Sequence, residues 1–532
     1  MNDFPNLPFL TEDFAPKGNG IDFLGLRQVN LNIVQTELVP DINNVTIDVG
    51  TYFLGTWIAW KFLELCGGDS TKFTLENFNS FKEAVEVAIA HSSSDTSPTN
   101  KLYGRVRNRV GNEQKIDFSG PLSFERASRN ASLYDAPLYG PSIRYLGFTQ
   151  YAMSTDHGSA GFMIPSDDSD INSICHYVDA CLKMATSYNK LVSLSPNTLT
   201  ETEVFDLAIV GLTPAKYRKL TGNVQLAAIR KILPSGHRRT ETAKLIVSTI
   251  ELLGPQTSKQ LRAIWYTGLT PGGDMLDLND QSLKGHAVRW AVFQARQIQR
   301  YILESLLCCL ERVVDKGIRS VAEIVDALYS TWPGAVPATL LSIMDEELGQ
   351  SGLTIDERAA AWCSTVGPDS GQYDFISFVD DQDAFPNALK SLARWWLRVE
   401  ARPDLKSAVK SVAGDETGRI PMLLFHQWVE ERLHDDLKAV VSQVLAEYVF
   451  SQHLRIALSR LDSNGIRQRL ALGDRGIEKI RKVENFARTV PPDMADRLDA
   501  LINLMDDLGI VKLDDKVISL DYGSHLDLGT KS

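Results

Sequence analysis

The sequence predicts a mainly α, multi-domain helical protein with winged-helix-like modules, small β-hairpin wings and a C-terminal winged helix. Two observations carry this prediction. Apolar residues recur at helical spacing through most of the chain after about residue 240, whereas strand patterns are sparse outside the tail. The tail itself joins an amphipathic helix, a glycine stop and two short strands within residues 493–522.

The C-terminal pattern is the most specific in the chain. Apolar residues follow one another in alternating steps of four and three, at Met494, Leu498, Leu501, Met505 and Leu508. Gly509 then ends the helix, and residues 510–513 and 517–522 predict two strands around an acidic turn at Asp514-Asp515. A helix followed by such a hairpin is the order of the last helix and wing of a winged helix.

Composition limits the class of protein. The 532 residues are 44% hydrophobic and 23% charged, which is ordinary for a folded globular chain. A formal net charge of −12 disfavours a surface that binds nucleic acid or anionic lipid throughout, although a local basic patch still could. The chain has neither a leader pattern nor an apolar run long enough for a membrane span, so we expect a cytoplasmic protein with no membrane partner.

The cysteines match no zinc or redox spacing, so we expect six reduced thiols, mostly buried. They are Cys66, Cys175, Cys181, Cys308, Cys309 and Cys363.

We expect five regions along the chain. Residues 1–95 combine an irregular N-terminal arm with an aromatic-rich helical region, and residues 96–235 form a mixed, loop-rich helical region with a basic patch. Residues 236–365 are helical with a winged-helix-like start, residues 366–462 are helical, and residues 463–532 form the C-terminal winged-helix-like module.

Three features within the helical regions are more specific. Helical spacing up to Gly254-Pro255, followed by a second helix from Thr257-Ser258, matches the first half of a second winged-helix-like unit whose wing is not evident. Residues 284–315 predict one long helix with an apolar stripe from Val288 to Val313. Loops are expected at 367–371 and 403–418.

Two clusters of cations are candidate nucleic-acid contacts. The first follows a polar segment and consists of Lys101, Arg105, Arg107 and Arg109. The second occupies the expected loop and helix before the last helix, with a local net charge of +4, and consists of Arg467, Arg469, Arg475, Lys479, Arg481, Lys482 and Arg488. The last helix opposes this reading, because phosphates would be repelled by Asp493, Asp496, Asp499, Asp506 and Asp507. A protein-docking wing is therefore favoured over DNA contact, and DNA binding remains an open alternative.

A search for reaction machinery identifies no catalytic residue, no metal site and no cofactor. The chain has no phosphate-binding Gly-x-x-x-x-Gly-Lys-Ser/Thr loop, no His-Glu-x-x-His and no Gly-x-Ser-x-Gly. The carboxylates of 345–347 and 380–383 could hold Mg²⁺ but are interpreted as solvated clusters. His434-Asp435-Asp436 is interpreted as a solvated helix start, and His453 as a satisfied polar residue in a helix interface.

Several phrases resemble large helical accessory proteins encoded in bacterial antiphage defence islands. They are Gly25-Leu26-Arg27, the segment 40–46, Tyr145-Leu146-Gly147-Phe148, the segment 452–458 and the closing winged-helix pattern. The resemblance implies an accessory or scaffold subunit of a multi-protein defence system, and it implies no catalytic residue.

The resulting hypothesis is a non-catalytic scaffold subunit that binds other subunits of the same defence system, with DNA left open as a further partner. One alternative is a metal-dependent nuclease or phosphohydrolase that uses dispersed Asp, Glu and His residues. Another is a winged-helix DNA-binding regulator.

Overall fold

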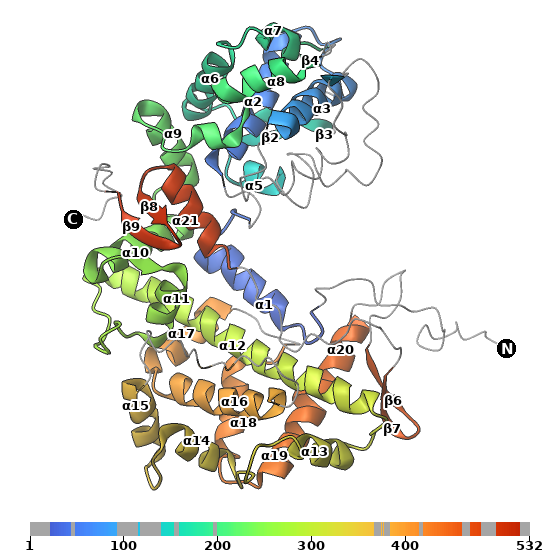
Figure 1. Cartoon of the computed structure of the whole chain (residues 1–532), viewed down its shortest axis with the longest axis vertical. Helices are drawn as coiled ribbons and strands as arrows, with labels where there is room; N and C mark the ends of the chain where they lie inside the picture. The colour runs from blue at the N-terminus through green and yellow to red at the C-terminus, as the bar shows by residue number, and fades with distance from the viewer. Residues whose placement is uncertain are drawn as a thin grey trace, which may run out of the picture. The chain divides into compact units, whose positions relative to one another are not determined.

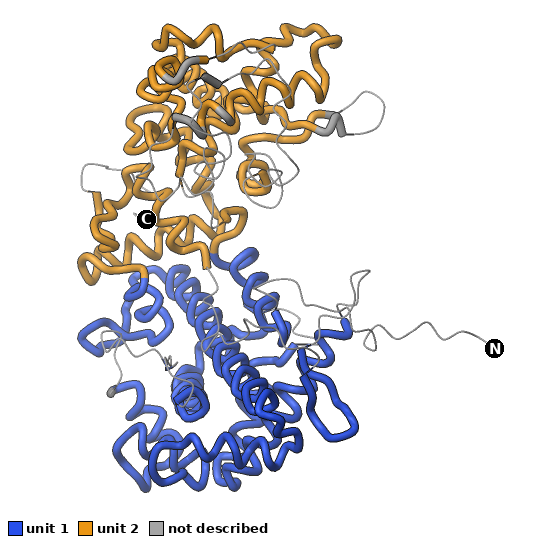
Figure 2. The backbone as a smooth tube through the Cα atoms, turned by 45° about the vertical axis from the view of Figure 1, so that its right-hand side comes forward, with its two compact units in different colours: residues 1–38, 259–494 blue, residues 39–258, 495–532 orange. Residues whose placement is uncertain are grey.

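The computed structural model divides the chain into two compact units, each built from two separate chain segments. Unit 1 consists of Met1–Leu38 and Lys259–Met494, and unit 2 consists of Val39–Ser258 and Ala495–Ser532 (Figure 2). The structure describes residues 22–43, 48–92, 115–116, 140–153, 159–194, 199–365, 374, 376, 383–413, 419–459, 469–479 and 496–521.

The described residues of unit 1 form helices, one hairpin and an isolated bridge between Leu269 and Met275 (Figure 1). Its elements are α1 (Leu26–Ile33), η2 (Val34–Leu38), α11 (Ser258–Thr267), α12 (Gln281–Asp315), α13 (Val321–Tyr329), α14 (Leu340–Leu348), α15 (Ile355–Thr365), α16 (Ala384–Glu400), α17 (Pro403–Ala413), α18 (Met422–Glu430), α19 (Leu437–Gln443), η8 (Val444–Ser451), α20 (Gln452–Ser459), β6 (Leu470–Gly473) and β7 (Gly476–Lys479). The first residue of α11, Ser258, is assigned to unit 2.

Unit 2 combines helices with small antiparallel sheets. Its elements are α2 (Val49–Cys66), α3 (Leu75–Ser92), β1 (Lys115–Ile116), α5 (Gly140–Tyr145), β2 (Thr149–Met153), β3 (Ser159–Pro165), α6 (Ser169–Leu182), α7 (Tyr188–Leu191), β4 (Leu199–Thr200), α8 (Glu201–Leu207), η5 (Ala208–Leu212), η6 (Pro214–Tyr217), α9 (Gly222–Ile232), α10 (Arg238–Leu253), β5 (Gln256–Thr257), α21 (Leu498–Asp507), β8 (Val511–Asp514) and β9 (Val517–Leu520). The prediction of a mainly helical protein is confirmed.

Helix α12 is the core of unit 1. It packs against α1, α16, α17 and η8 (Figure 1). Most of its residues are buried, and they lie on more than one side of the helix. The predicted stripe is buried from Val292 to Val313, so the expected long helix is confirmed. Buried polar groups also find partners there: the Trp395 indole donates to the Ala295 carbonyl at 2.9 Å, and Arg300 pairs with Glu304 at 2.9 Å.

Helix α2 is the corresponding core of unit 2. Its sequence is apolar on all sides, which is the pattern of a helix enclosed by other elements. It packs against α3, α6, β3 and η6, and Tyr52, Phe53 and Trp57 are fully buried. Gly50 allows the helix to approach η6 closely, because a Cβ at this position would lie 2.2 Å from the Pro214 carbonyl oxygen.

Two local expectations are wrong. The expected loop at 403–418 contains helix α17, because Pro403 occupies the first helical position, where a missing N–H costs nothing, and Leu405, Val409 and Val412 form a buried stripe. The expected loop and helix before the last helix contains the β6–β7 hairpin, in which Gly473 pairs with Gly476 across a two-residue turn. All six cysteines are free, as expected, and Cys66, Cys175 and Cys309 are buried.

Candidate functional site

A three-stranded antiparallel sheet joins two distant parts of the unit 2 sequence. Its strand order is β5-β9-β8, with Gln256 opposite Ile518 and Thr257 opposite Val517. Helix α10 precedes β5 directly, helix α21 precedes β8 directly, and α10 packs against both α21 and β9. The helix–turn segment near residue 250 and the C-terminal helix–hairpin therefore form one assembly, here called the split module: α10, β5, α21, β8 and β9.

The hairpin of the split module forms as its sequence predicts. Asp515 and Lys516 occupy the turn with φ values of 46° and 69°, as in the type I′ turns that match the twist of paired strands. The turn therefore lies one residue later than expected. Val511 and Ile518 are buried on the inner face, whereas Lys512 is exposed on the outer face.

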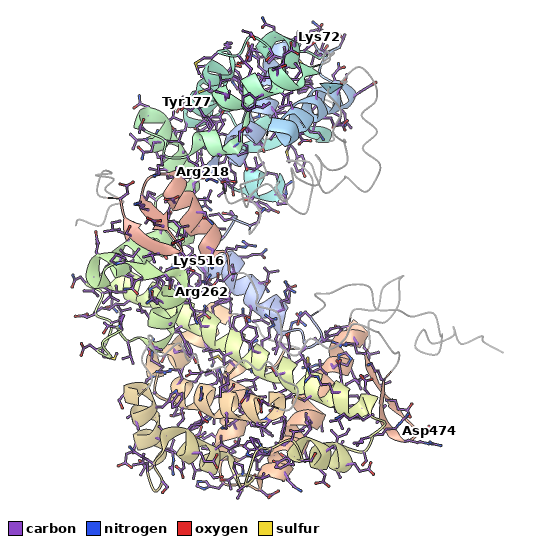
Figure 3. The ribbon with its side chains drawn as sticks, in the orientation of Figure 1. Lys72, Tyr177, Arg218, Arg262, Asp474 and Lys516 are labelled. Atoms are coloured by element: carbon purple, nitrogen blue, oxygen red, sulfur yellow. The ribbon has the colours of Figure 1, made fainter. Side chains whose placement is uncertain are left out.

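The outer face of the hairpin mixes charge with an apolar side chain. Because Asp514 is opposite Val517 and Lys512 is opposite Ser519, these four side chains share one side of the sheet. Lys512, Asp514 and Val517 are exposed, and the Lys512 ammonium lies 3.5 Å from the Asp514 carboxylate. Lys516 follows at the turn (Figure 3).

Helix α21 is buried on most of its circumference. The predicted apolar residues Leu498, Leu501 and Met505 are buried, but so are Ala500, Ile502 and Leu504 on the other sides of the helix. Among its ten residues only Asp499 is exposed, with Asn503 and Asp506 half-buried. Such a helix presents a narrow, acidic strip to solvent.

Asp507 anchors the end of α21 inside unit 2. Its carboxylate accepts a hydrogen bond from the Val49 N–H at 3.0 Å and lies 3.5 Å from the Arg218 guanidinium. Arg218 also pairs with Asp48 at 3.0 Å. Burial, with Asp48 and Asp506 adding to it, raises the pKa of Asp507 to about 7. Nearby, Gln225 donates to the Leu508 carbonyl at 2.8 Å.

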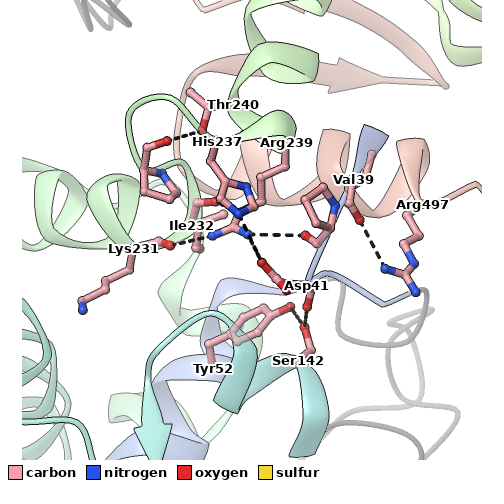
Figure 4. Close-up of polar contacts among 12 residues, drawn as sticks. Val39, Asp41, Tyr52, Ser142, Lys231, Ile232, His237, Arg239, Thr240 and Arg497 are labelled. Carbon is pink, nitrogen blue, oxygen red and sulfur yellow. Dashed lines mark hydrogen bonds and ion pairs between the residues drawn. The ribbon is translucent and has the colours of Figure 1, made fainter. Parts of the chain in front are cut away.

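The start of α10 is fixed by a buried arginine (Figure 4). The Arg239 guanidinium donates to the Ile232 carbonyl at 2.5 Å and to the Asp41 carboxylate at 2.7 Å. The Asp41 carbonyl in turn accepts from Ser142 at 2.8 Å, and Ser142 lies 2.8 Å from the Tyr52 hydroxyl. The split module is thereby joined to Asp41 and, through Ser142, to Tyr52 of α2.

The second cation cluster lies partly within unit 1. Arg469 is largely buried, with its guanidinium 2.6 Å from the Glu311 carboxylate and over the Phe23 ring at 4.4 Å. Lys479 pairs with Asp315 of α12 at 2.5 Å. Arg475 is exposed at the turn of the β6–β7 hairpin, next to Asp474 (Figure 3).

The remaining predicted contacts lie outside the described residues. They are Lys101, Arg105, Arg107, Arg109, Arg467, Arg481, Lys482 and Arg488. Nucleic-acid binding by either cluster stays a prediction.

Three of the acidic candidates from the sequence, Asp436, Asp345 and Glu347, have structural partners. Asp436 caps α19 by accepting the Ala439 N–H at 3.1 Å, and His434 and Asp435 are exposed. Asp345 pairs with Arg358 at 2.8 Å, and Glu347 pairs with Arg394. Residues 380–382 lie outside the described part of the chain.

His453 lies in a helix interface, as expected. It is fully buried, and its Nε2 accepts the Arg469 N–H at 3.1 Å and the Leu470 N–H at 3.3 Å. These bonds hold the first strand of the β6–β7 hairpin against α20.

The structure brings together one cluster of metal-ligating residue types that the sequence analysis did not predict. Glu400, His426 and Glu430 each offer a ligand atom within 4.8 Å of the others. The four-residue spacing of His426 and Glu430 is a signal that the sequence contains, since it places both on one face of a helix. Glu400 comes from a different helix, and no local pattern connects it to them.

No described helix of the chain is both long and apolar enough to cross a membrane. No family model, no curated protein and no solved structure matches the chain.

Proposed function

We propose that this chain is a non-catalytic, partner-binding subunit and that the split module is its docking element, a winged helix divided by the insertion of unit 1 residues. The observation that carries the proposal is the strand order β5-β9-β8. In a winged helix the strand after the first helix pairs with the second strand of the wing. The pairing of β5, which follows α10, with β9, the second strand of the hairpin after α21, supports the proposal.

A protein is a better partner for this element than DNA. In a DNA reader of this class the helix before the wing enters the major groove, and α21, which precedes the hairpin, has neither the exposed surface nor the positive charge for that role. Residues 496–521 contain seven aspartates and three cations. The outer face of the hairpin, with one cation, one anion and an exposed valine, suits a mixed polar and apolar protein interface.

The resemblance to accessory proteins of bacterial antiphage defence supports the choice of partner. We propose that the partner is another subunit of such a multi-protein system, acting in the cytoplasm. DNA contact by the β8–β9 hairpin itself belongs to the regulator alternative, which the same experiment tests.

The test is binding of the full chain to proteins encoded beside it, with hairpin and control variants. The hairpin variant is Lys512→Glu with Val517→Asp, and the control is Lys72→Glu with Leu75→Asp at the start of α3. The pairs are matched: Lys512 and Lys72 are 56% and 51% exposed, each 3.5 Å from an aspartate, and Val517 and Leu75 are 40% and 44% exposed.

We expect the partner to co-purify with the unaltered chain and the control but to bind the hairpin variant at least about tenfold more weakly, as loss of a central contact of about 1.4 kcal/mol or more would produce. Equal binding by the two variants would refute the docking role. Retardation of duplex DNA that the hairpin variant alone loses would establish the regulator alternative instead.

A further inference from the structure

Three polar side chains of unit 1 meet where α16 and α18 end. Glu400 is the last residue of α16, and His426 and Glu430 lie four positions apart on α18. One oxygen from each glutamate and one imidazole nitrogen lie within 4.8 Å of one another. His426 is buried, Glu400 is half-buried and Glu430 is exposed, so the cluster opens at the surface of the unit.

The His426 ring is held in one orientation. The Trp396 ring stacks on it at 5.0 Å with an angle of 8° between the planes, and the Trp396 indole donates to the His426 carbonyl at 3.1 Å. The imidazole also hydrogen-bonds the Trp396 backbone. Because Nε2 has no hydrogen-bond partner, Nδ1 makes that bond. A histidine that donates one ring N–H to the backbone presents its other nitrogen as a metal ligand.

The free nitrogen faces an acceptor. His426 is 3% exposed, and its Nε2 lies 3.4 Å from Glu400 Oε2. At this distance the lone pair of the ring nitrogen and a carboxylate oxygen can bind the same cation.

We propose that Glu400, His426 and Glu430 bind one divalent transition-metal ion of the zinc class. Two ligands at about 2.0–2.1 Å from a tetrahedral ion are about 3.3 Å apart, close to the spacing of Nε2 and Glu400 Oε2. An imidazole among carboxylates suits Zn²⁺ better than Mg²⁺ or Ca²⁺, which prefer oxygen alone. Three protein ligands leave a fourth position for water or for a group on a partner.

Lys406 is the internal competitor for this site. Its ammonium donates to the same Glu400 oxygen at 2.5 Å, so it neutralises the carboxylate while the ion is absent. Binding of the ion therefore requires Lys406 to give up or share that oxygen. Replacing Lys406 with methionine, which keeps the apolar stem and removes the charge, should increase the affinity for the ion.

The experiment is calorimetric titration of the metal-free full chain with Zn²⁺ and, separately, with Mg²⁺. The variants are Glu430→Gln, His426→Gln and Lys406→Met, and the control is Glu431→Gln, which removes an equal charge from the next residue, also exposed. We expect one equivalent of Zn²⁺ to bind, with weak Mg²⁺ binding. Loss of a ligand should cost more than the roughly tenfold that loss of a supporting group costs.

We therefore expect at least about tenfold weaker Zn²⁺ binding by Glu430→Gln and His426→Gln, unchanged binding by Glu431→Gln and tighter binding by Lys406→Met. Should His426→Gln fail to fold, Glu430→Gln decides, because this residue is exposed. Equal affinities of the unaltered chain and Glu430→Gln, tighter Mg²⁺ than Zn²⁺ binding, or no gain from Lys406→Met would overturn the proposal. None of these outcomes depends on the partner-binding role.

Discussion

Asp507 should make the stability of unit 2 fall as pH rises, and Asp507→Asn should remove that dependence. The carboxyl is buried at the end of α21, and its pKa rises from an ordinary 3.8 to about 7. Because the folded state holds this proton more tightly than the unfolded chain, folding takes up a proton between these values. The stabilisation that the Asp507 carboxyl contributes to the folded state is therefore fully present below pH 3.8 and is lost as pH rises through about 7.

The size of the effect follows from the shift. At about 1.4 kcal/mol per pKa unit, a shift from 3.8 to about 7 corresponds to about 4 kcal/mol in total. Of this, about 2.5 kcal/mol should be lost between about pH 5 and pH 8. Asparagine keeps an oxygen for the Val49 N–H and carries no charge, and Arg218 retains Asp48 as a partner. Between about pH 5 and pH 8, the free energy of unfolding of Asp507→Asn should therefore rise by about 2.5 kcal/mol relative to that of the unaltered chain.

The measurement must report on unit 2 alone, since a two-unit chain need not unfold in one step. Met505 is fully buried in α21, so its oxidation by peroxide across a urea gradient reports the unfolding of that helix. Asp499→Asn is the control, because it removes an equal charge from the exposed strip of the same helix. If the unaltered chain and Asp507→Asn show parallel pH profiles, the reasoning about the buried carboxyl is refuted.

Three further substitutions test other parts of the structure. Gly50→Ala should lower the free energy of unfolding by about 1–3 kcal/mol in thermal melts, because the new Cβ would meet the Pro214 backbone. This loss is expected even though alanine is the better helix former by about 1 kcal/mol. Arg469→Met should lower the free energy of unfolding in urea by about 3–5 kcal/mol, because it leaves the buried Glu311 without its partner. Burial already raises the pKa of Glu311 to about 7. Adding Glu311→Gln to this variant should restore most of the lost stability. Arg475→Glu should change the free energy of unfolding by less than about 0.5 kcal/mol, because Arg475 is exposed. If the β6–β7 hairpin contacts phosphate, this substitution should also reduce the salt slope of DNA binding by about one.

The strongest local patterns predicted local structure well. The spacing of Leu498, Leu501 and Met505 identified α21, and alternation with a polar turn identified the hairpin after it. The stripe along 284–315 identified α12. The fold buries most of the apolar residues that define each pattern, and in α21 it also buries Ala500, Ile502 and Leu504 on the other sides of the helix.

Long-range relations were not predictable from the same information. Strand β5 has two residues, too few to show an alternation, and its partner β9 lies beyond all of the inserted unit 1 residues. The sequence alone therefore predicts a separate unit near residue 250 whose wing is not evident. The same limit hid the cluster of Glu400 with His426, since two helices bring them together and only side-chain geometry shows a ring nitrogen without a partner.

The aspartates of the tail have a different meaning in the structure from the one suggested by their count. In the sequence they indicated an acidic face that repels phosphate. In unit 2, Asp496 accepts the Leu498 N–H at 3.1 Å, Asp506 accepts the Leu513 N–H at 3.0 Å, and Asp507 accepts the Val49 N–H. These carboxylates organise the ends of α21 and its junction with the hairpin. Burial of α21, more than its charge, therefore keeps this helix from entering a DNA groove, and the outer face of the β8–β9 hairpin is the surface to test by mutation.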